Sequence, residues 1–413
     1  MLFRSLGGQD RETINSIKYT APKAFSSQGR AVTKEDYISL IQQNNSGLTF
    51  DAVNVWGGEE NAAPSYGKVF VSVKPTGAYT LTDVQKQTLI NDVISPISVL
   101  TVKPTLVEPD YTYIQVTADV VYDPKKTNLT ASQIQQLTSN TIQSFATTTL
   151  NTFNSTFLLS DLSNQIKLQD ASIVTNQVSI RLQKKFNPIL TTSQESYTLD
   201  YSTPLQRGAV LSGISSSPAM QFLNPANSSQ VIDGVYLEEL PVYTGGIESV
   251  SIINPGYNYS KTPTVTILGD GVGATAVATL NASGAITKIT VTNAGTGYTS
   301  AVVKITNATG DTSGIQASAV AILQGQYGTI RSYYVTSDSA KQILYNNVGT
   351  IDYVNGVIQL NCFNLVNVDN ALGQLTVTVT PQSTILYSNY NKILTVDPFD
   401  PNAIVVNVTA KTK

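Results

Sequence analysis

The sequence predicts an α+β N-terminal half, made of small two-layer α/β sandwich units, followed by a mostly β C-terminal half with an inserted two-repeat β module. Three observations support this fold class. Helical and strand patterns alternate as far as about residue 190. Beyond it, helical periodicity ends and Thr, Val, Ser, Asn, Gly and Tyr dominate. Two segments of the second half repeat one another at an offset of 39 residues.

Helices in the first half are expected where a threonine precedes a capping partner by three positions. The predicted caps are Thr33 with Asp36 in place of the usual Glu or Gln, Thr82 with Gln85, and Thr130 with Gln133. The second of these helices should end near Val93. A shorter fourth helix fits residues 161–168, and each helix has one apolar face toward a core.

Strands in the first half show apolar residues at alternate positions, the pattern of a strand with one buried face. The alternating sets are Val69, Val71 and Val73; Ile114, Val116, Ala118 and Val120; and Val178, Ile180 and Leu182. Strand–helix–strand units of this size predict two α/β domains, residues 1–95 and 96–190.

The second half is expected to hold a discontinuous β domain, residues 191–244 plus 326–413, interrupted by a module at 245–325. In the module, Asn254, Gly256 and Tyr259 match Asn293, Gly295 and Tyr298. Asn and Gly favour the positive φ of a turn, and the tyrosine can cover the hairpin face. Each copy is therefore interpreted as a three-stranded β-meander, and the pair as a compact pseudo-twofold unit.

Composition restricts the possible functions. The 413 residues carry 25 Lys+Arg against 28 Asp+Glu, without the basic surplus of a nucleic-acid binder. No apolar run is long enough to span a membrane. The chain has no histidine and one cysteine, which excludes histidine-based triads, the commonest zinc ligand and an internal disulfide. We therefore expect no catalytic residue, no cofactor and no metal site.

Two binding or catalytic alternatives remain. Glu59 and Glu60 follow a tryptophan and could form a glycosidase pair, but adjacent residues on an extended loop point apart. Tyr257, Tyr259 and Tyr298 could stack on sugar rings, or they could simply cover a half-buried sheet. The packing interpretation is favoured for most of the tyrosines.

Several short motifs in order resemble one protein family. They are Gly7-Gly8-x-Asp10-x-Glu12, Ala21-Pro22, Gln28-Gly29-Arg30-Ala31-Val32-Thr33-x-x-Asp36-Tyr37, Val55-Trp56-Gly57-Gly58-Glu59 and Tyr66-Gly67-Lys68-Val69-Phe70. This set resembles the baseplate J-like proteins of contractile phage tails, and more closely the baseplate wedge subunit of T-even-like phages. A later segment, 349–360, which contains Asp352, Tyr353 and Gly356, is similar to a strand–turn–strand of that subunit's C-terminal β domain.

The resemblance implies a non-enzymatic virion protein of the tail baseplate, assembled in the host cytoplasm. It implies that the chain pairs with itself within a ring of wedges around the tail hub, and that it contacts other wedge and hub proteins. Family members of the closer type carry a long N-terminal region, so the expectation is that this chain is a fragment or a truncated reading frame. The repeat module is expected to be an insertion.

Within the resemblance, two residues have competing interpretations. Arg30 could grip a carboxylate of a neighbouring wedge protein, but a local pair with Asp36 is favoured. Trp56 is expected to lie in a core or at a domain seam more than at an interface. The alternatives to a wedge subunit are a tail-associated adhesin that binds host glycans through residues 245–325, and a carboxylate-based glycan hydrolase.

Overall fold

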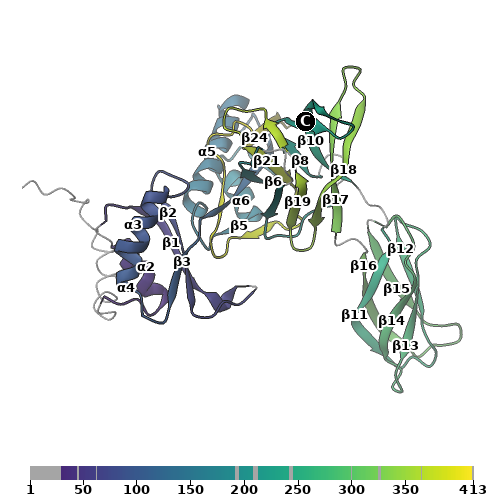
Figure 1. Cartoon of the computed structure of the whole chain (residues 1–413). Helices are drawn as coiled ribbons and strands as arrows, with labels where there is room; N and C mark the ends of the chain where they lie inside the picture. Colours follow the sequence, from purple (N-terminus) through teal and green to yellow (C-terminus); the bar gives the residue numbers. More distant parts are fainter. Residues whose placement is uncertain are drawn as a thin grey trace, which may run out of the picture. The chain divides into compact units, whose positions relative to one another are not determined.

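The computed structural model describes residues 29–43, 46–61, 63–190, 195–207, 213–240, 245–298, 300–323, 327–363 and 365–411 (Figure 1). The chain divides into two compact units. The first comprises Met1–Phe186, Tyr201–Pro204 and Thr376–Lys413, and the second comprises Asn187–Asp200 and Leu205–Leu375.

The first unit begins with a three-stranded sheet covered by helices. Strands β1 (Phe50–Gly57) and β2 (Lys68–Pro75) pair antiparallel, and β3 (Lys103–Leu106) runs parallel to β2. Helix α2 (Lys34–Gln42) packs against this sheet together with the helical segment that continues from α3 (Asp83–Thr88). Their shared core includes Tyr37, Ile41, Val55, Val71, Val73, Leu89 and Ile94. The capping boxes predicted at Thr33 and Thr82 are both present.

The helix that begins after Thr82 does not end near Val93. A π-helical segment, η2 (Leu89–Ile94), follows α3 and leads into the short helix α4 (Ser95–Ile97). Pro96 has no N–H to donate and its ring would clash with an α-helical carbonyl one turn earlier. The wider π turn is a known way to absorb such a break. Since β3 completes the first sheet, the division expected at residue 95 would separate this strand from its partner.

The rest of the first unit is a longer sheet with two helices. Strand β4 (Asp110–Tyr122) pairs antiparallel with β6 (Ile173–Phe186). In the sequence, β4 and β6 are separated by α5 (Ala131–Thr149), the short strand β5 (Thr156–Leu158) and α6 (Leu159–Leu168). Ile114, Val116, Ala118 and Val120 are all buried, as the alternating pattern predicts. On α5 the stripe of Ile134, Ile142 and Phe145 is buried, and Leu137 is partly buried.

The end of the chain joins this first unit. Strands β23 (Lys392–Thr395) and β24 (Ile404–Ala410) both run parallel to β4, and β22 (Ile385–Tyr387) pairs with β5. Strand β21 (Leu375–Val379) lies beside β6. The expectation placed residues up to 413 with the C-terminal β domain. Strands β23 and β24 lie more than 250 positions after β4 in the sequence, so no local sequence pattern indicates that they pair with it.

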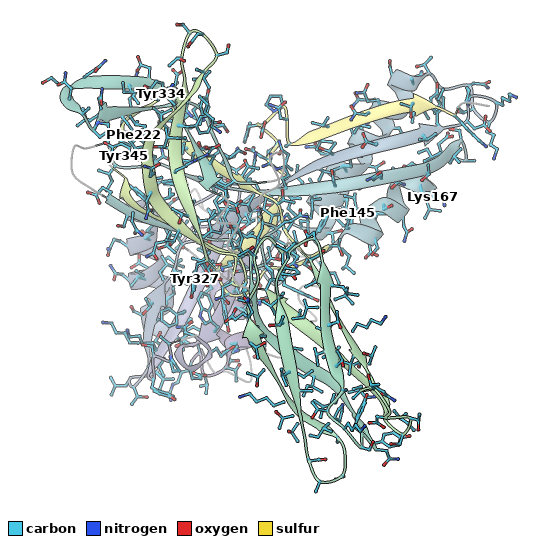
Figure 2. The ribbon with its side chains drawn as sticks, turned by 90° about the vertical axis from the view of Figure 1, so that its right-hand side faces the viewer. Phe145, Lys167, Phe222, Tyr327, Tyr334 and Tyr345 are labelled. Atoms are coloured by element: carbon cyan, nitrogen blue, oxygen red, sulfur yellow. The ribbon has the colours of Figure 1, made fainter. Side chains whose placement is uncertain are left out.

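The second unit contains an antiparallel sheet in the order β8-β10-β17-β18-β19-β7. Its strands are β7 (Glu195–Asp200), β8 (Ser215–Ser217), β10 (Asn227–Leu240), β17 (Tyr327–Val335), β18 (Lys341–Asp352) and β19 (Val357–Phe363). Strand β9 (Met220–Asn224) pairs with β10 and with β20 (Leu365–Val368). The Phe222 and Tyr345 rings lie 6.1 Å apart on this unit (Figure 2). The described residues from 195 onward contain no helix, which confirms the mostly β second half.

Residues 247–323 form a separate six-stranded sheet. Its strands are β11 (Ile247–Tyr257), β12 (Thr264–Gly269), β13 (Thr275–Leu280), β14 (Ile286–Asn293), β15 (Ala301–Thr306) and β16 (Ile315–Leu323), in the order β11-β16-β15-β12-β13-β14. The end strands also meet, because the Ile247 N–H donates to the Ala294 carbonyl at 2.6 Å. Tyr259, Ile267, Ile289 and Tyr298 contribute to one core inside the sheet.

The strand order corrects the interpretation of each copy as a meander. The first strand of one copy pairs with the last strand of the other, β11 with β16, and the middle strands β12 and β15 pair with each other. If each strand is replaced by its equivalent in the other copy, the same strand order is obtained, read from the opposite end. A pseudo-twofold axis therefore passes between β12 and β15. Neither copy has a complete set of strand partners alone.

Candidate interaction surfaces

The Arg30 region shows a helix cap without the expected local ion pair. The Asp36 carboxylate accepts from the backbone N–H groups of Val32 (3.2 Å) and Thr33 (2.9 Å). Arg30 is exposed and forms no ion pair with any described residue. Gly29 has a φ of +74°, a backbone conformation that favours glycine. Gln28 and the motifs at 7–12 and 21–22 lie outside the described residues.

Trp56 is a buried seam residue. Its ring stacks on Phe70 at a centroid distance of 5.7 Å and packs against Tyr390 at 5.6 Å. The indole N–H donates to the Asn61 side chain at 3.0 Å. Because Tyr390 comes from the end of the chain, Trp56 joins the first sheet to the C-terminal segment. This placement agrees with the expectation of a core or seam residue.

The two glycines after Trp56 shape the turn that follows β1. A Cβ at Gly58 would lie 1.9 Å from the Ser65 carbonyl oxygen, so only glycine fits there. The Gly57 N–H donates to Glu60 at 2.9 Å, and Glu60 also pairs with Lys34 at 2.6 Å. The Lys34 hydrogen bond is the main cause that lowers the pKa of the Glu60 carboxyl. A glycosidase acid needs a raised pKa, so this arrangement does not support the hydrolase alternative.

Tyr390 is held in an unusual backbone conformation beside a polar pocket. Its φ is +59°, which is rare for a bulky residue. The Asn54 side chain donates to the Tyr390 carbonyl at 2.6 Å, and the Tyr390 hydroxyl donates to the Glu60 carbonyl at 2.8 Å. Asn154 donates to Asn54 at 3.1 Å. These bonds fix the C-terminal segment against the first sheet and border a pocket of about 420 Å³.

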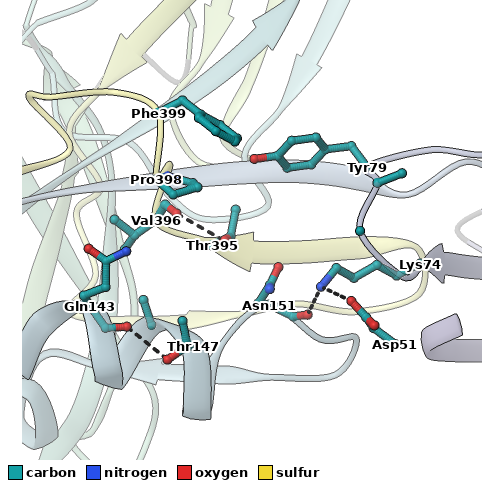
Figure 3. Close-up of a pocket in the computed structure, with 13 residues that line it drawn as sticks. Asp51, Lys74, Tyr79, Gln143, Thr147, Asn151, Thr395, Val396, Pro398 and Phe399 are labelled. Atoms are coloured by element: carbon teal, nitrogen blue, oxygen red, sulfur yellow. Dashed lines mark hydrogen bonds and ion pairs between the residues drawn. The ribbon is translucent and has the colours of Figure 1, made fainter. Parts of the chain in front are cut away.

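A second pocket, of about 270 Å³, has a charged floor and an aromatic rim (Figure 3). Lys74 on the floor is buried, pairs with Asp51 at 3.1 Å and donates to the Asn151 carbonyl at 3.2 Å. Tyr79 and Phe399 lie at the rim, and the Phe399 side chain is 81% exposed. Exposed aromatic side chains on a fixed loop suit contacts with another protein.

The loop that carries Phe399 is fixed by its own side chains. Asp397 accepts from the Phe399 N–H at 2.8 Å, and Asp400 accepts from the Asn402 N–H at 2.8 Å. Asp397 also forms an ion pair with Lys185. Asx turns and flanking prolines restrict the backbone of such a loop, which holds Phe399 at an exposed position.

The family-motif hairpin forms as expected from its sequence. Gly349 pairs with Leu360 in β18 and β19, and Gly356 in the turn has a φ of +71°. The Asp352 carboxylate accepts from the Val354 and Asn355 N–H groups at 3.1 and 3.0 Å. Tyr353 is buried and donates its hydroxyl hydrogen to Glu239. These residues therefore build the turn and its packing.

The repeat tyrosines are structural groups. Tyr298 and Tyr259 are 3% and 6% exposed, whereas Tyr257 is 55% exposed. The Tyr298 hydroxyl accepts from the Ala274 N–H at 3.3 Å, and the Tyr259 hydroxyl accepts from the Ala317 N–H at 3.1 Å. Each tyrosine thus contacts the other copy. Two of the three rings proposed to stack on sugars are buried, so the adhesin alternative is not supported.

The Asn-x-Gly turns bring the backbone close to these rings. The Asn254 and Asn293 side chains accept from the N–H groups two residues later, each at 3.0 Å. Gly256 and Gly295 have φ values of +63° and +66°. A Cβ at either glycine would lie 2.8 Å from the ring of the tyrosine in its own copy. Glycine is therefore required both for the turn and for the contact with the ring.

Asp311 fixes the segment after Tyr259. Its carboxylate accepts from the N–H groups of Ser313 at 3.0 Å and Ser260 at 2.9 Å. The Ser313 backbone bond, followed by that of Lys261, holds the pKa of this carboxyl well below its ordinary value. A lowered folded-state pKa stabilises the fold above the ordinary carboxyl pKa, and the effect is lost as the pH falls through the lowered value.

The module should therefore lose stability as the pH falls below about 4. Asp311→Asn should destabilise the module at pH 6, and the difference from the parent should shrink on acidification. Thermal unfolding of both chains at several pH values from 6 down to about 2 checks this, because the change is expected below about pH 4. A difference that does not change with pH would contradict the assignment to Asp311.

Some contact residues gave no usable signal in the sequence. The hydrogen bond between Asn54 and Tyr390 joins positions 336 residues apart, and the bond between Asn154 and Asn54 joins positions 100 residues apart. Phe399 has a local signal, since it stands between two Asp-Pro pairs, which favour turns. Among the described residues, no three side chains are grouped to hold a metal ion, and no helix is long and apolar enough to cross a membrane.

Comparison with known proteins identifies two segments of the first unit. Residues 33–107 match the family described as baseplate structural protein gp6, C-terminal domain I, and residues 110–185 match baseplate structural protein gp6, C-terminal domain III. A search of curated proteins gave no match. The first segment runs from the α2 cap to just past β3, and the second from the start of β4 almost to the end of β6. The two gp6-like domains indicate that the chain is a structural protein of a phage tail baseplate.

Proposed function

We propose that the chain is a baseplate wedge subunit of the T-even-like, baseplate J-like type. It forms a ring around the tail hub by associating with itself and with other wedge proteins, and it is assembled in the host cytoplasm. The observation that carries this proposal is the pair of gp6-like matches, because two domains of one baseplate protein occur here in order. A ring of identical subunits requires that each subunit use the same contact surfaces, repeated around the ring axis.

The surface of the first unit suits a role in assembly. Tyr66 and Leu100 are 81% and 101% exposed, in addition to Phe399. The two pockets are small, and side chains that already bond one another line them. Exposed aromatic and aliphatic side chains of this kind are available for contacts with other proteins.

Co-expression with the other baseplate proteins of the same genome tests the proposal. A wedge subunit should elute in a stable complex with at least one of them, with a mass that light scattering can assign. Failure to bind any of the baseplate proteins would contradict it. Phe399→Ser provides a variant for locating the contact, because its side chain has few intramolecular contacts to lose.

We further propose that residues 245–325 are an inserted, autonomous module that spaces or decorates the wedge. The strands of 247–323 pair among themselves in the described residues. On the host sheet, Leu240 pairs with Thr329 on adjacent antiparallel strands, so the two ends of the insertion leave and rejoin neighbouring strands. An insertion also predicts that Thr244 and Gln326 lie close together, and both of these residues are outside the described part of the chain.

Replacement of residues 246–325 by a short Gly/Ser link should leave the remaining fold intact. Each doubling of the length of a surface loop costs only about 0.6 kcal/mol, so shortening this one should change the stability of the remaining fold by at most about 2 kcal/mol. Hydrogen exchange of peptides from β10 and β17 checks the result. Aggregation, or loss of a cooperative unfolding transition, would show that the module belongs to the core.

A further inference from the structure

Strand β24 forms an open border of the sheet in the first unit. It runs parallel to β4 from Ile404, opposite Val116, to Ala410, opposite Tyr122. Its yellow arrow lies along the outer side of this sheet in Figure 2. Within the described residues, no strand pairs with the other side of β24. A row of backbone groups therefore remains available there.

The ladder to β4 determines which groups face outward. Val116 donates its N–H to the Ala403 carbonyl at 2.8 Å, and Lys411 donates its N–H to the Tyr122 carbonyl at 2.8 Å. In a parallel ladder, alternate residues direct both backbone groups to the same neighbour. The backbone N–H and C=O groups of the odd-numbered residues of β24 thus point toward β4, and those of the even-numbered residues point away from it. The outward residues are Ile404, Val406, Val408 and Ala410.

One of the outward groups has a partner in the described part of the chain. The Gln135 side chain of α5 donates to the Val406 carbonyl at 2.8 Å. A carbonyl oxygen has two lone pairs, so this bond leaves room for a second donor. The same bond shows that the outward side of β24 can be reached by a hydrogen-bond donor.

The edge strand β24 lacks the features that usually prevent an edge strand from pairing with another chain. Residues 404–410 contain no charged residue, no proline and no glycine. Four of the seven are Val or Ile, and Thr409 is also β-branched. Natural edge strands are commonly blunted by lysine, proline or a bulge. An uncharged, β-branched edge of this length is suited to receive another strand.

We propose that the partner of this edge is β24 of a second copy of the chain, paired antiparallel about a twofold axis near Asn407. In that register Ile404 opposes Ala410, and Val406 opposes Val408, so all four outward residues are used. An uncharged strand meets its own copy without repulsion, and β-branched residues directly opposite one another stabilise a sheet. A closed twofold contact of this kind uses the free side of β24 in both copies and stops at the dimer. This inference rests on the self-association in the proposed function and names its contact.

Sedimentation equilibrium of the full chain over a range of concentrations tests the contact. The parent should form dimers. Val408→Pro removes an N–H that faces away from β4, a position where edge strands tolerate proline, and should raise the dimer Kd by at least about tenfold. Asn407→Lys should do the same, because the two lysines would face each other across the axis. Its side chain is exposed and the backbone N–H is kept, so the strand is expected to remain although the Asn407 bond to Asp119 is lost. Thr290→Lys, an equally exposed strand substitution on β14, should leave the Kd unchanged.

Residue-resolved amide exchange supplies the second readout. The Val406 and Val408 amides should become protected as the dimer forms, whereas the Val405 and Asn407 amides, which face β4, are protected throughout. Dimers that persist in both variants would overturn the β24 contact while leaving self-association intact. A parent that stays monomeric at high concentration would overturn self-association itself, and with it this contact.

Discussion

Trp56→Ala is expected to destabilise the first unit by about 3–5 kcal/mol, the range for deleting a buried aromatic side chain. Trp56 is 5% exposed, and alanine would lose the stacking on Phe70, the contact with Tyr390 and the bond to Asn61. Tyr390 would also lose one of the contacts that hold its positive φ. The effect should spread from the first sheet to the C-terminal segment.

Hydrogen exchange by peptide is the appropriate measurement, because the only tryptophan is removed and fluorescence would lose its reporter. Peptides covering 50–75 and 385–395 should both lose protection, and peptides from the module should not change. Trp56→Phe is the matched control. It keeps a stacked ring, loses the indole N–H and should cost nearer to about 1 kcal/mol. Loss of protection confined to residues 50–75 would show that Trp56 does not join the two segments.

Tyr298→Ala should destabilise the module by a similar amount, about 3–5 kcal/mol. Its ring lies against Gly271 of the other copy, where an added Cβ would come within 2.4 Å. Its N–H donates to the Gly245 carbonyl at 2.7 Å, and its hydroxyl accepts from Ala274. Because the contact crosses between the copies, both halves of the module should lose protection together.

The pseudo-twofold axis provides matched controls. Tyr259→Ala should resemble Tyr298→Ala, because the Tyr259 side chain is also buried and its hydroxyl accepts from the Ala317 N–H of the other copy at 3.1 Å. Tyr257→Ala should change stability by less than about 0.5 kcal/mol, since that ring is exposed. Thermal unfolding of the three variants gives the comparison. Equal losses for Tyr257 and Tyr259 would contradict the packing role of the repeat tyrosines.

Local features of the fold were predictable from the sequence because their causes are local. The caps at Thr33, Thr82 and Thr130 depend on a partner three residues away, and all three form. The alternation in β4 likewise follows from one buried face. The helix beyond Val93 was missed because Pro96 usually ends a helix, and the π-helical turn that accommodates it has no simple sequence signature.

Long-range features were not predictable in the same way. A repeat shows that two segments share a local structure, but it does not state whether a strand pairs within its own copy or with the other, as β11 does with β16. The pairing of β24 with β4 also has no local cause. In the candidate site, Trp56 could be singled out as a rare residue in a family motif. Tyr390 and Asn54 could not, since their contact depends on tertiary structure.

Electron microscopy of intact tails, labelled with an antibody against the 245–325 module, tests the central claim most directly. A baseplate structural protein should carry the label in repeated positions around the tail hub, at the level of the baseplate. A ring of evenly spaced label there is the predicted result. Label at the tips of tail fibres, along the sheath, or absent from purified tails would contradict the assignment of this chain to the baseplate.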